Sequence, residues 1–491
     1  MNVNGIDVPS GHLIDGVRVD GGADIAVHAP ADGALLGQVP DGGPAEIAAA
    51  VEAARRAFPA WAALGPDGRG VVLDHFAEAI QAHGAALAAV ESADTGMIPA
   101  FVDALVIPRC VRNISEFADR ARQLNREVLA GPVVDNHVRY DPAGVAALIL
   151  PWNAPLMLGT GKIGAALAAG DTVVVKPPEW APLSLSLLGD IALEAGIPSG
   201  VLNVVQGRGH TAGAALTAHS GIARISFTGS PEAARAISIA AAPNLVPLSF
   251  ELGGKSPFVV LEDADLEHAA QMAILQFSHA GQVCLAGTRL LVHEAVLEDF
   301  LDRVLRALPA MVVGDPREPG TRIGPLIHPD HAARVKGFVD RAIADGARPV
   351  VGGGVHSKGP LYFEPTILTD VKPDAEIVQS EVFGPVLTLQ AFSDDGEAVD
   401  LANSTTYGLA AMIFTAEEER AQLLAEQIVA GTVWVNCFYE RDLDAPFGGS
   451  RTSGVGREGG RWSFDFFCDV KNVAVRRGSF VERGASNRAE H

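Results

Sequence analysis

The feature that most restricts the fold of this chain is an alternation of short apolar segments with segments of helical periodicity between residues 145 and 242. The expected strands and the helices that follow them cover residues 145–150 and 158–169, 172–176 and 184–195, 201–205 and 212–218, and 225–227 and 231–242. Strands that alternate with helices indicate a parallel, doubly wound α/β sheet. Such a sheet binds its ligands at the carboxyl ends of its strands.

The flanking regions predict further elements around this unit. Apolar residues at helical spacing predict helices over residues 45–64, 71–91 and 104–125, and the alternation within 131–140 favours a strand. A second α/β stretch runs from about residue 251 to 431, with strands at 255–260, 289–292, 347–351 and, just beyond it, 433–435. The polar tail 476–491 is expected to be frayed. At roughly 150 residues per domain, 491 residues suggest about three domains.

Charge and composition exclude several classes of protein. The chain has 37 Lys and Arg against 59 Asp and Glu, and 37 − 59 gives a net charge of −22. This charge argues against a nucleic-acid binder and against attachment to anionic lipid. The apolar runs are far shorter than a membrane span, and no secretory signal is visible at the N-terminus. We therefore expect a soluble, cytoplasmic protein.

The four cysteines, Cys110, Cys284, Cys437 and Cys468, form no CxxC pair and no metal-ligand spacing, so no metal site is expected. Cys284 ends the sequence Gly-Gln-Val-Cys, where small residues in a turn can leave a thiol exposed. A thiolate attacks carbonyl carbon readily. A buried structural cysteine is the alternative for Cys284, and the apolar surroundings of Cys110 and Cys468 favour that role for both. Cys437 follows Asn436 near an expected strand end and is intermediate between an exposed, reactive cysteine and a buried, structural one.

Two further polar residues are candidates for catalysis. Glu251 lies between apolar residues just before two glycines, where desolvation would raise its pKa and make it a better general base. Its alternative role is an ion pair with Lys255. Asn153 follows the strand 145–150 in the sequence Pro-Trp-Asn, where its amide can donate to a developing oxyanion. Turn formation would explain an asparagine at this position equally well.

Three expected strands end in residues that suit a nucleotide. Lys176 and Glu179 offer a cation and a carboxylate together, as a ribose requires. Gly209 and Gly213 form a loose glycine pattern, and residues 227–230 (Phe-Thr-Gly-Ser) lead into a helix whose N-terminus favours phosphate. Each feature alone is weak evidence for nucleotide binding, because none is a true GxGxxG motif and an ordinary strand-to-helix turn would explain each of them. Together, at successive strand ends, they favour a nucleotide site.

Taken in order, these motifs resemble the aldehyde dehydrogenase superfamily from about residue 42 to 475. The resemblance is carried by PWN at 151–153, KPPE at 176–179, FTGS at 227–230, ELGGKSP at 251–257, GQVC at 281–284, EVFGPV at 381–386 and PFGGSRTSGVGREGG at 446–460. Any one of them could arise by chance, but seven in the family's order indicate membership. The chain departs from the family's common pattern at His279-Ala280 and at Ser450-Arg451.

The resemblance implies a catalytic role for four residues. Cys284 matches the nucleophile that adds to the aldehyde, and Asn153 with the backbone N–H of Cys284 matches the oxyanion hole. Glu251 matches the base that activates water to hydrolyse the thioester left after hydride transfer. Lys162 falls at a position that the family uses near the active site. Because Glu251 is present, release of a free carboxylate is favoured over transfer to coenzyme A.

The cofactor that the resemblance implies is NAD. Glu179 favours NAD over NADP, since a carboxylate accepts from a ribose hydroxyl and repels a 2′-phosphate. The implied cofactor-binding residues are Pro151, Trp152, Lys176, Glu179, Gly209, Gly213, Phe227, Gly229, Ser230, Leu252, Gly253, Glu381 and Phe383.

Two segments bear on the small-molecule aldehyde substrate. Residues 107–109 and 439–443 look like the segments of 2-hydroxymuconate and 2-aminomuconate semialdehyde dehydrogenases that carry carboxylate-binding arginines, here Arg109 and Arg441. Tyr439 and Phe447 are candidate substrate contacts beside them. Two guanidinium groups would bind a substrate carboxylate bidentately. The alternative role for both residues is that of ordinary surface arginines, with Arg441 paired to Asp442 or Asp444. The alternative substrate is an aromatic or aliphatic aldehyde without a carboxylate. The alternative from another functional class is a structural or binding protein that has the same fold but catalyses no reaction.

The resemblance also implies an architecture of three parts. An NAD-binding domain is expected over residues 1–123 and 143–252, and a catalytic domain over 253–456. A small bridging sheet and tail are expected over 124–142 and 457–491. Bridging strands present open edges that need a partner chain, so a homodimer or a homotetramer is expected.

Overall fold

Two large sheets and one small sheet form the framework of the computed structural model, which describes residues 1–124 and 127–477. The predicted strand at 145–150, and those at 172–176, 201–205 and 225–227, are present in the first sheet. Its order is β21 (Gly454–Val455), β13 (Leu248–Leu252), β12 (Arg224–Gly229), β9 (Val145–Ile149), β10 (Thr172–Lys176), β11 (Leu202–Val204), β3 (His12–Ile14) and β4 (Val17–Val19). The central five strands are parallel, as expected. The outer pairs are antiparallel: β21 with β13, β3 with β11, and β4 with β3.

The register of the first sheet brings the predicted motifs together. Ile149 of β9 is opposite Lys176 of β10 on one side and Phe227 of β12 on the other. Gly229 of β12 is opposite Leu252 of β13. The segments that follow these four strands therefore emerge side by side at one edge of the sheet.

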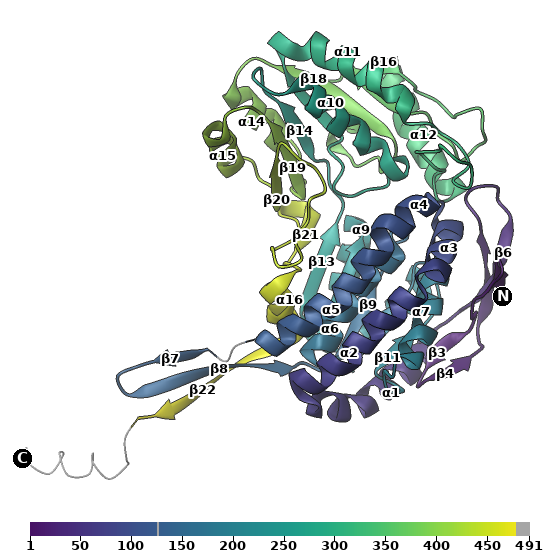
Figure 1. The fold of residues 1–491 in the computed structure, drawn as a ribbon, viewed down its shortest axis with the longest axis vertical. Helices are drawn as coiled ribbons and strands as arrows, with labels where there is room; N and C mark the ends of the chain where they lie inside the picture. The colour runs from purple at the N-terminus through teal and green to yellow at the C-terminus, as the bar shows by residue number, and fades with distance from the viewer. Residues whose placement is uncertain (125–126, 478–491) are drawn as a thin grey trace, which may run out of the picture.

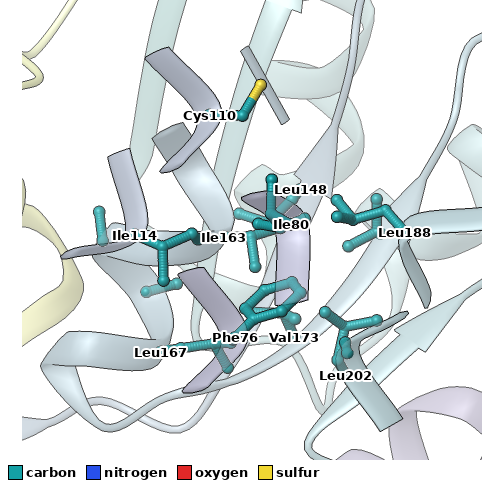
Figure 2. Close-up of a cluster of buried hydrophobic side chains, with 14 of the residues drawn as sticks. Phe76, Ile80, Cys110, Ile114, Leu148, Ile163, Leu167, Val173, Leu188 and Leu202 are labelled. Carbon is teal, nitrogen blue, oxygen red and sulfur yellow. The ribbon is translucent and has the colours of Figure 1, made fainter. Parts of the chain in front are cut away.

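Nine helices of the described chain accompany the first sheet, and all except α4 bury residues in the cores on its two faces. They are α1 (Pro44–Ala63), α2 (Gly65–Ala82), α3 (Gly84–Thr95), α4 (Pro99–Phe101), α5 (Ile107–Gln123), α6 (Pro155–Ala169), α7 (Leu183–Glu194), α8 (Ala214–Ala218) and α9 (Pro231–Ala241). Figure 2 shows how side chains of α2, α5, α6 and α7 meet those of β9, β10 and β11, with Cys110 at the margin of the cluster. Cys110 and Cys468 are both buried, as expected.

Two helix predictions in this region need correction. The single helix expected over 71–91 is two helices, because the chain leaves helical geometry at His83 and α3 starts at Gly84. A Cβ at Gly84 would lie 3.0 Å from Ile107 Cγ2, so this glycine allows a close approach of α3 to α5. Before α5, residues Val102–Val106 form a π-helical turn, and the expected end of this helix at Asn125 lies outside the described residues.

The second large sheet has the order β16 (Arg348–Val351), β17 (Thr366–Thr369), β18 (Val386–Phe392), β15 (Arg289–His293), β14 (Pro257–Val260), β19 (Ala410–Phe414) and β20 (Thr432–Val435). All its neighbours pair in parallel except β16 and β17. Its helices are α10 (Leu266–Ile274), α11 (Leu297–Ala307), α12 (Pro329–Ala344), α13 (Glu376–Gln379), α14 (Asp395–Asn403) and α15 (Glu418–Gln427). Only residues 253–256 separate β13 of the first sheet from β14 of the second (Figure 1).

The third sheet is a three-stranded antiparallel ribbon that projects away from the other two (Figure 1). It consists of β22 (Cys468–Arg476), β8 (Val134–Pro142) and β7 (Val128–Ala130), and α16 (Gly460–Phe467) leads into β22. Val128, Leu129, Val470 and Val475 are exposed on it. Asn125 of the expected bridging segment, and residues 478–491 of the tail, lie outside the described residues. The division of the chain into domains stays a prediction.

Two short hairpins complete the N-terminal region. One joins β1 (Asn2–Val3) to β2 (Ile6–Asp7), and the other joins β5 (Ala23–His28) to β6 (Leu35–Asp41). Across the two described stretches of the chain, the helices are all too short or too polar to cross a membrane.

Candidate active site

Cys284 lies in a tightly constrained loop between helix α10 and strand β15 of the second sheet. His279, Ala280 and Gly281 before it all adopt left-handed backbone conformations, with φ of 50°, 53° and 68°. A Cβ at Gly281 would lie 2.2 Å from the main-chain oxygen of Gly384, so only glycine fits there. Burial, followed by the charges of Glu381 and Glu251, raises the pKa of the Cys284 thiol to about 12. The thiol is therefore close enough to interact electrostatically with both Glu381, a predicted cofactor contact, and Glu251, the predicted base.

Asn153 reaches this loop from the end of β9. Its Nδ2 donates to the main-chain oxygen of Gln282 at 2.9 Å, and its side chain is buried. Gln282 is itself fixed, because Ile327 N donates to its Oε1 at 2.9 Å. Since an amide carries two N–H groups, one donor of Asn153 stays available next to Cys284.

Glu251, near the end of β13, is buried and neither of its carboxylate oxygens has a hydrogen-bond partner within the described residues. Burial raises its pKa well above the usual range, the charge of Glu458 raises it further, and Lys162 opposes this shift. The suggested ion pair with Lys255 is absent, because the Lys255 Nζ is buried without a hydrogen-bond partner in the same part of the chain. A carboxyl in this state is suited to accept a proton near neutral pH.

Glu458 is a site residue that sequence reasoning missed. It pairs with Lys162 Nζ, which also donates to Ser226 Oγ at 2.8 Å. Lys162 on α6 is almost fully buried, so this ion pair holds the lysine beside Glu251. Glu458 belongs to the glycine-rich segment 446–460, and its place in that segment is the one feature of the sequence that could have identified it as a site residue.

Lys176 and Glu179 form a clamp at the ends of β10 and β11. Lys176 Nζ donates to the main-chain oxygen of Gly207 at 2.8 Å and lies 3.4 Å from Glu179 Oε2. Glu179 Oε1 accepts from Gly209 N at 3.3 Å. Gly213 lies against this clamp, since a Cβ there would be 3.5 Å from Lys176 Cδ. The predicted cation–carboxylate pair is therefore present beside the glycine-containing turn.

The turn from β12 to α9 exposes Ser230 at the N-terminus of a helix. Ser230 caps α9 by accepting from Ala233 N at 3.2 Å. The ring of Phe227 packs against Gly229, where a Cβ would lie 2.3 Å from the ring. Such an N-terminus favours an anion such as a phosphate.

Four loops meet beside Cys284. Glu381 Oε1 accepts from Gly254 N at 3.0 Å, and a Cβ on Gly253 would lie 2.0 Å from Glu381 Oε2. The ring of Phe383 meets that of Trp152 edge to face at 5.2 Å. Pro151 precedes Trp152 and is half-buried, and Leu252 is buried just before Gly253. Residues 151–153, 252–254, 281–284 and 381–383 thus form one site.

Arg109 and Arg441 also lie together. Arg109 Nη1 donates to the main-chain oxygen of Arg441 at 3.1 Å, and the Arg441 guanidinium lies 3.7 Å from the centre of the Phe447 ring. Neither arginine has a carboxylate within 4 Å in the described chain. Burial, then the charges of Arg441 and Arg112, lowers the pKa of Arg109 to about 10.

The suggested pairing of Arg441 with a neighbouring aspartate is wrong. Asp444 pairs instead with Arg120 of α5, and Asp442 accepts from the Asp444 main-chain N–H. Desolvation and the nearby Cys284 sulfur raise the pKa of Tyr439, whereas Arg441 and Arg109 lower it. Tyr439 is therefore close enough to interact electrostatically with all three of these side chains.

The described residues contain no group of three His, Cys, Asp or Glu side chains that could hold a metal ion. Two hollows of about 230 and 560 Å³ lie elsewhere, beside β8 and beside residues 219–223, and contain none of the candidate residues.

Comparison with known proteins identifies similar sequences and structures. Residues 17–473 match the aldehyde dehydrogenase family. The chain is 40% identical to a 2-hydroxymuconic semialdehyde dehydrogenase of Pseudomonas sp. (strain CF600), over 91% of this chain and 95% of that protein. It is 41% identical to a 5-carboxymethyl-2-hydroxymuconate semialdehyde dehydrogenase of Escherichia coli, over 92% and 98%. A structure of indole-3-acetaldehyde dehydrogenase with NAD+ superposes with a TM-score of 0.93 at 37% identity, covering 96% of this chain and 97% of that one.

Proposed function

The chain belongs to the aldehyde dehydrogenase family, and from that premise we propose that it oxidises a carboxylate-bearing semialdehyde with NAD through a thioester on Cys284. The observation that carries this proposal is the convergence of Cys284, Asn153 and Glu251 from three separate elements of two sheets. Beside them lie two arginines that have no carboxylate partner among the described residues.

The residues around the site fit NAD. Lys176 and Glu179 would hold a ribose, and the α9 N-terminus capped by Ser230 would hold a phosphate. Gly229 and Gly253 leave room where a Cβ would meet Phe227 or Glu381. When bound, NAD supplies the hydride acceptor.

The chain's own residues would perform the remaining steps. Cys284 gives its thiol proton to Glu251, which passes it to solvent, and Sγ forms a bond to the aldehyde carbon. The C=O double bond becomes a single bond, and its oxygen becomes an anion held by the free N–H of Asn153 and the main-chain N–H of Cys284. Loss of hydride from that carbon leaves a thioester. Glu251 removes a proton from water, which attacks the thioester carbon, and the C–S bond breaks to release the acid. Lys162 and Glu458 set the charge around Glu251.

The class of substrate follows from Arg109 and Arg441. Both relatives named above are muconate-type semialdehyde dehydrogenases. A carboxylate at the far end of the substrate would give the two guanidinium groups the partner that they lack within the chain. In a protein of net charge −22, this pair would also be a local attraction for an anionic aldehyde.

The proposal is tested by following NADH formation over aldehydes with and without a carboxylate. We expect turnover that is faster for the semialdehydes, abolished in Cys284→Ala, and retained in Cys437→Ala, the matched change at the other half-buried cysteine. NADH formation by Cys284→Ala would refute the mechanism. Equal rates on benzaldehyde and on a muconate-type semialdehyde would refute the substrate class and favour an uncharged aldehyde.

Assembly and location complete the proposal. The open edges of β7 and β22, with Val128 and Val475 exposed beside them, favour a homodimer or homotetramer joined through this ribbon. Four unpaired cysteines suit a reducing compartment, and we place the protein in the cytoplasm. Sedimentation of the protein with and without residues 468–491 tests the assembly, and a monomer in both cases would contradict it.

A further inference from the structure

Asn113 on α5 forms hydrogen bonds in two directions. Its Oδ1 accepts from Arg109 Nε at 3.1 Å. Its Nδ2 donates to the main-chain oxygen of Met157 at 2.9 Å and to Thr160 Oγ1 at 3.0 Å, both on α6. Asn113 is 3% exposed, so water does not compete for these bonds. One buried amide therefore connects a candidate substrate-binding arginine to the helix that begins two residues after Asn153.

Asn113 is itself fixed in place by the packing of α5 on α6. A Cβ at Gly164 would lie 2.7 Å from the main-chain oxygen of Asn113, so the two helices approach closely at this point. Thr160 Oγ1 also donates to the main-chain oxygen of Met157, at 3.1 Å. Loss of the Asn113 amide would therefore leave Arg109 Nε without its acceptor, while the Met157 oxygen would keep a donor.

Arg109 needs a fixed acceptor because it lies beside a second positive charge. After burial, the charge of Arg441 is the next cause that lowers the pKa of Arg109. No carboxylate lies within 4 Å of either guanidinium in the described chain to offset this repulsion. Arg109 is held instead by two neutral groups, the Asn113 amide oxygen and the main-chain oxygen of Arg441. Neutral acceptors keep the guanidinium in place and leave its positive charge available to a ligand.

The same bonds determine which N–H groups of Arg109 stay free. A guanidinium has five N–H groups. Among the described residues, Asn113 takes the one on Nε, and the main-chain oxygen of Arg441 takes one on Nη1. The second N–H on Nη1 and both on Nη2 have no partner there. These two nitrogens form the edge of a guanidinium that a carboxylate can bind bidentately.

We propose that Asn113 is a positioning residue, which holds Arg109 so that its two terminal nitrogens receive a substrate carboxylate beside Arg441. It acts through Arg109 and does not touch the substrate. A neutral amide suits this role, since a carboxylate at position 113 would pair with Arg109 in place of the substrate. This inference rests on the proposed function, because it assumes that the substrate carries a carboxylate.

The test compares KM and kcat of the full-length enzyme for a muconate-type semialdehyde and for benzaldehyde. We expect Asn113→Leu, which removes the acceptor at similar volume, to raise KM for the semialdehyde about tenfold and to change kcat by less than about threefold. For benzaldehyde, both constants should change by less than about threefold. Asn113→Asp should also raise KM for the semialdehyde, because the new carboxylate competes with the substrate for Arg109.

Glu116→Leu is the matched control for Asn113→Leu. Glu116 accepts from Arg112 Nε at 2.7 Å on the same helix and with the same four-residue spacing, but this pair is exposed to solvent. Its loss should leave the preference between the two aldehydes unchanged. In a double-mutant cycle, Asn113→Leu should have no further effect on KM in an Arg109→Met background, since Asn113 acts through Arg109.

The other outcomes decide between positioning and packing. Equal losses on the two aldehydes in Asn113→Leu, or a loss that adds to that of Arg109→Met, would overturn the positioning role and leave Asn113 a packing residue between two helices. If Asn113→Leu does not fold, Asn113→Ser, whose hydroxyl is too short to reach Arg109 Nε, gives the same comparison without overpacking.

Failure of this inference differs from failure of the proposed function. A preference of the unaltered enzyme for the semialdehyde that survives in Asn113→Leu and Asn113→Ser would overturn the inference alone. Equal kcat/KM of the unaltered enzyme for both aldehydes would refute the proposed substrate class, and this inference with it.

Discussion

Replacing Arg441 by methionine should separate anionic from uncharged aldehydes. Arg441 has no carboxylate partner in the described residues, and its Nε has no hydrogen-bond partner there, so the change breaks no ion pair inside the protein. Methionine keeps an apolar contact with the Phe447 ring. A hydrogen bond between charged groups contributes about 1.5–3 kcal/mol, which corresponds to roughly 10- to 150-fold in an equilibrium constant.

The assay compares kcat/KM for a muconate-type semialdehyde and for benzaldehyde. We expect Arg441→Met to lower kcat/KM for the semialdehyde by roughly 10- to 150-fold and that for benzaldehyde by less than about threefold. Arg112→Met is the matched control, because Arg112 lies on the same helix as Arg109 but pairs with Glu116 at 2.7 Å. Equal losses on the two aldehydes, or no loss on either, would refute the carboxylate-binding role.

Three further predictions concern the nucleophile, the base and the cofactor clamp. Because burial and the charges of Glu381 and Glu251 raise the pKa of Cys284 to about 12, its alkylation by iodoacetamide should rise about tenfold per pH unit between roughly pH 7 and 10. A plateau below about pH 9 would contradict this prediction. Glu251 must be ionised to act as a base, and its pKa is raised. As the pH is lowered, kcat should therefore begin to fall at a pH well above the ~4.3 at which an ordinary glutamate titrates. A fall in kcat that begins only near that ordinary value would argue against Glu251 as the base. Glu179→Ser should raise kcat/KM for NADP relative to NAD by removing the charge that repels a 2′-phosphate, and an unchanged ratio would show that Glu179 does not select the cofactor.

Much of the fold was predictable because its central strands are buried on both faces. The strands β9 and β10 read as apolar runs, and the alternation of strand and helix indicated that the strands pair in parallel. The antiparallel edges were not predictable, because β3 and β21 have only three and two residues and show no periodicity. The break before Gly84 depends on packing against Ile107, a contact that sequence periodicity does not report.

The candidate site likewise contains residues that the sequence suggested and residues that only the fold reveals. Local sequence offered Asn153 and Glu251 only as candidates beside strands, each with an equally good or better structural alternative, and the resemblance to the family selected them. Glu458 acts through Lys162, which is 296 residues away along the chain, and only the fold brings the two together.

The central claim is that Cys284 carries the acyl group between hydride transfer and hydrolysis. It is tested most directly by mixing Glu251→Gln with NAD and the preferred aldehyde, quenching the reaction and mapping the acylated peptide by mass spectrometry. Slowed hydrolysis should let the thioester accumulate, with the added mass on Cys284 and none on Cys437. NADH formation without any acyl group on Cys284 would contradict the mechanism.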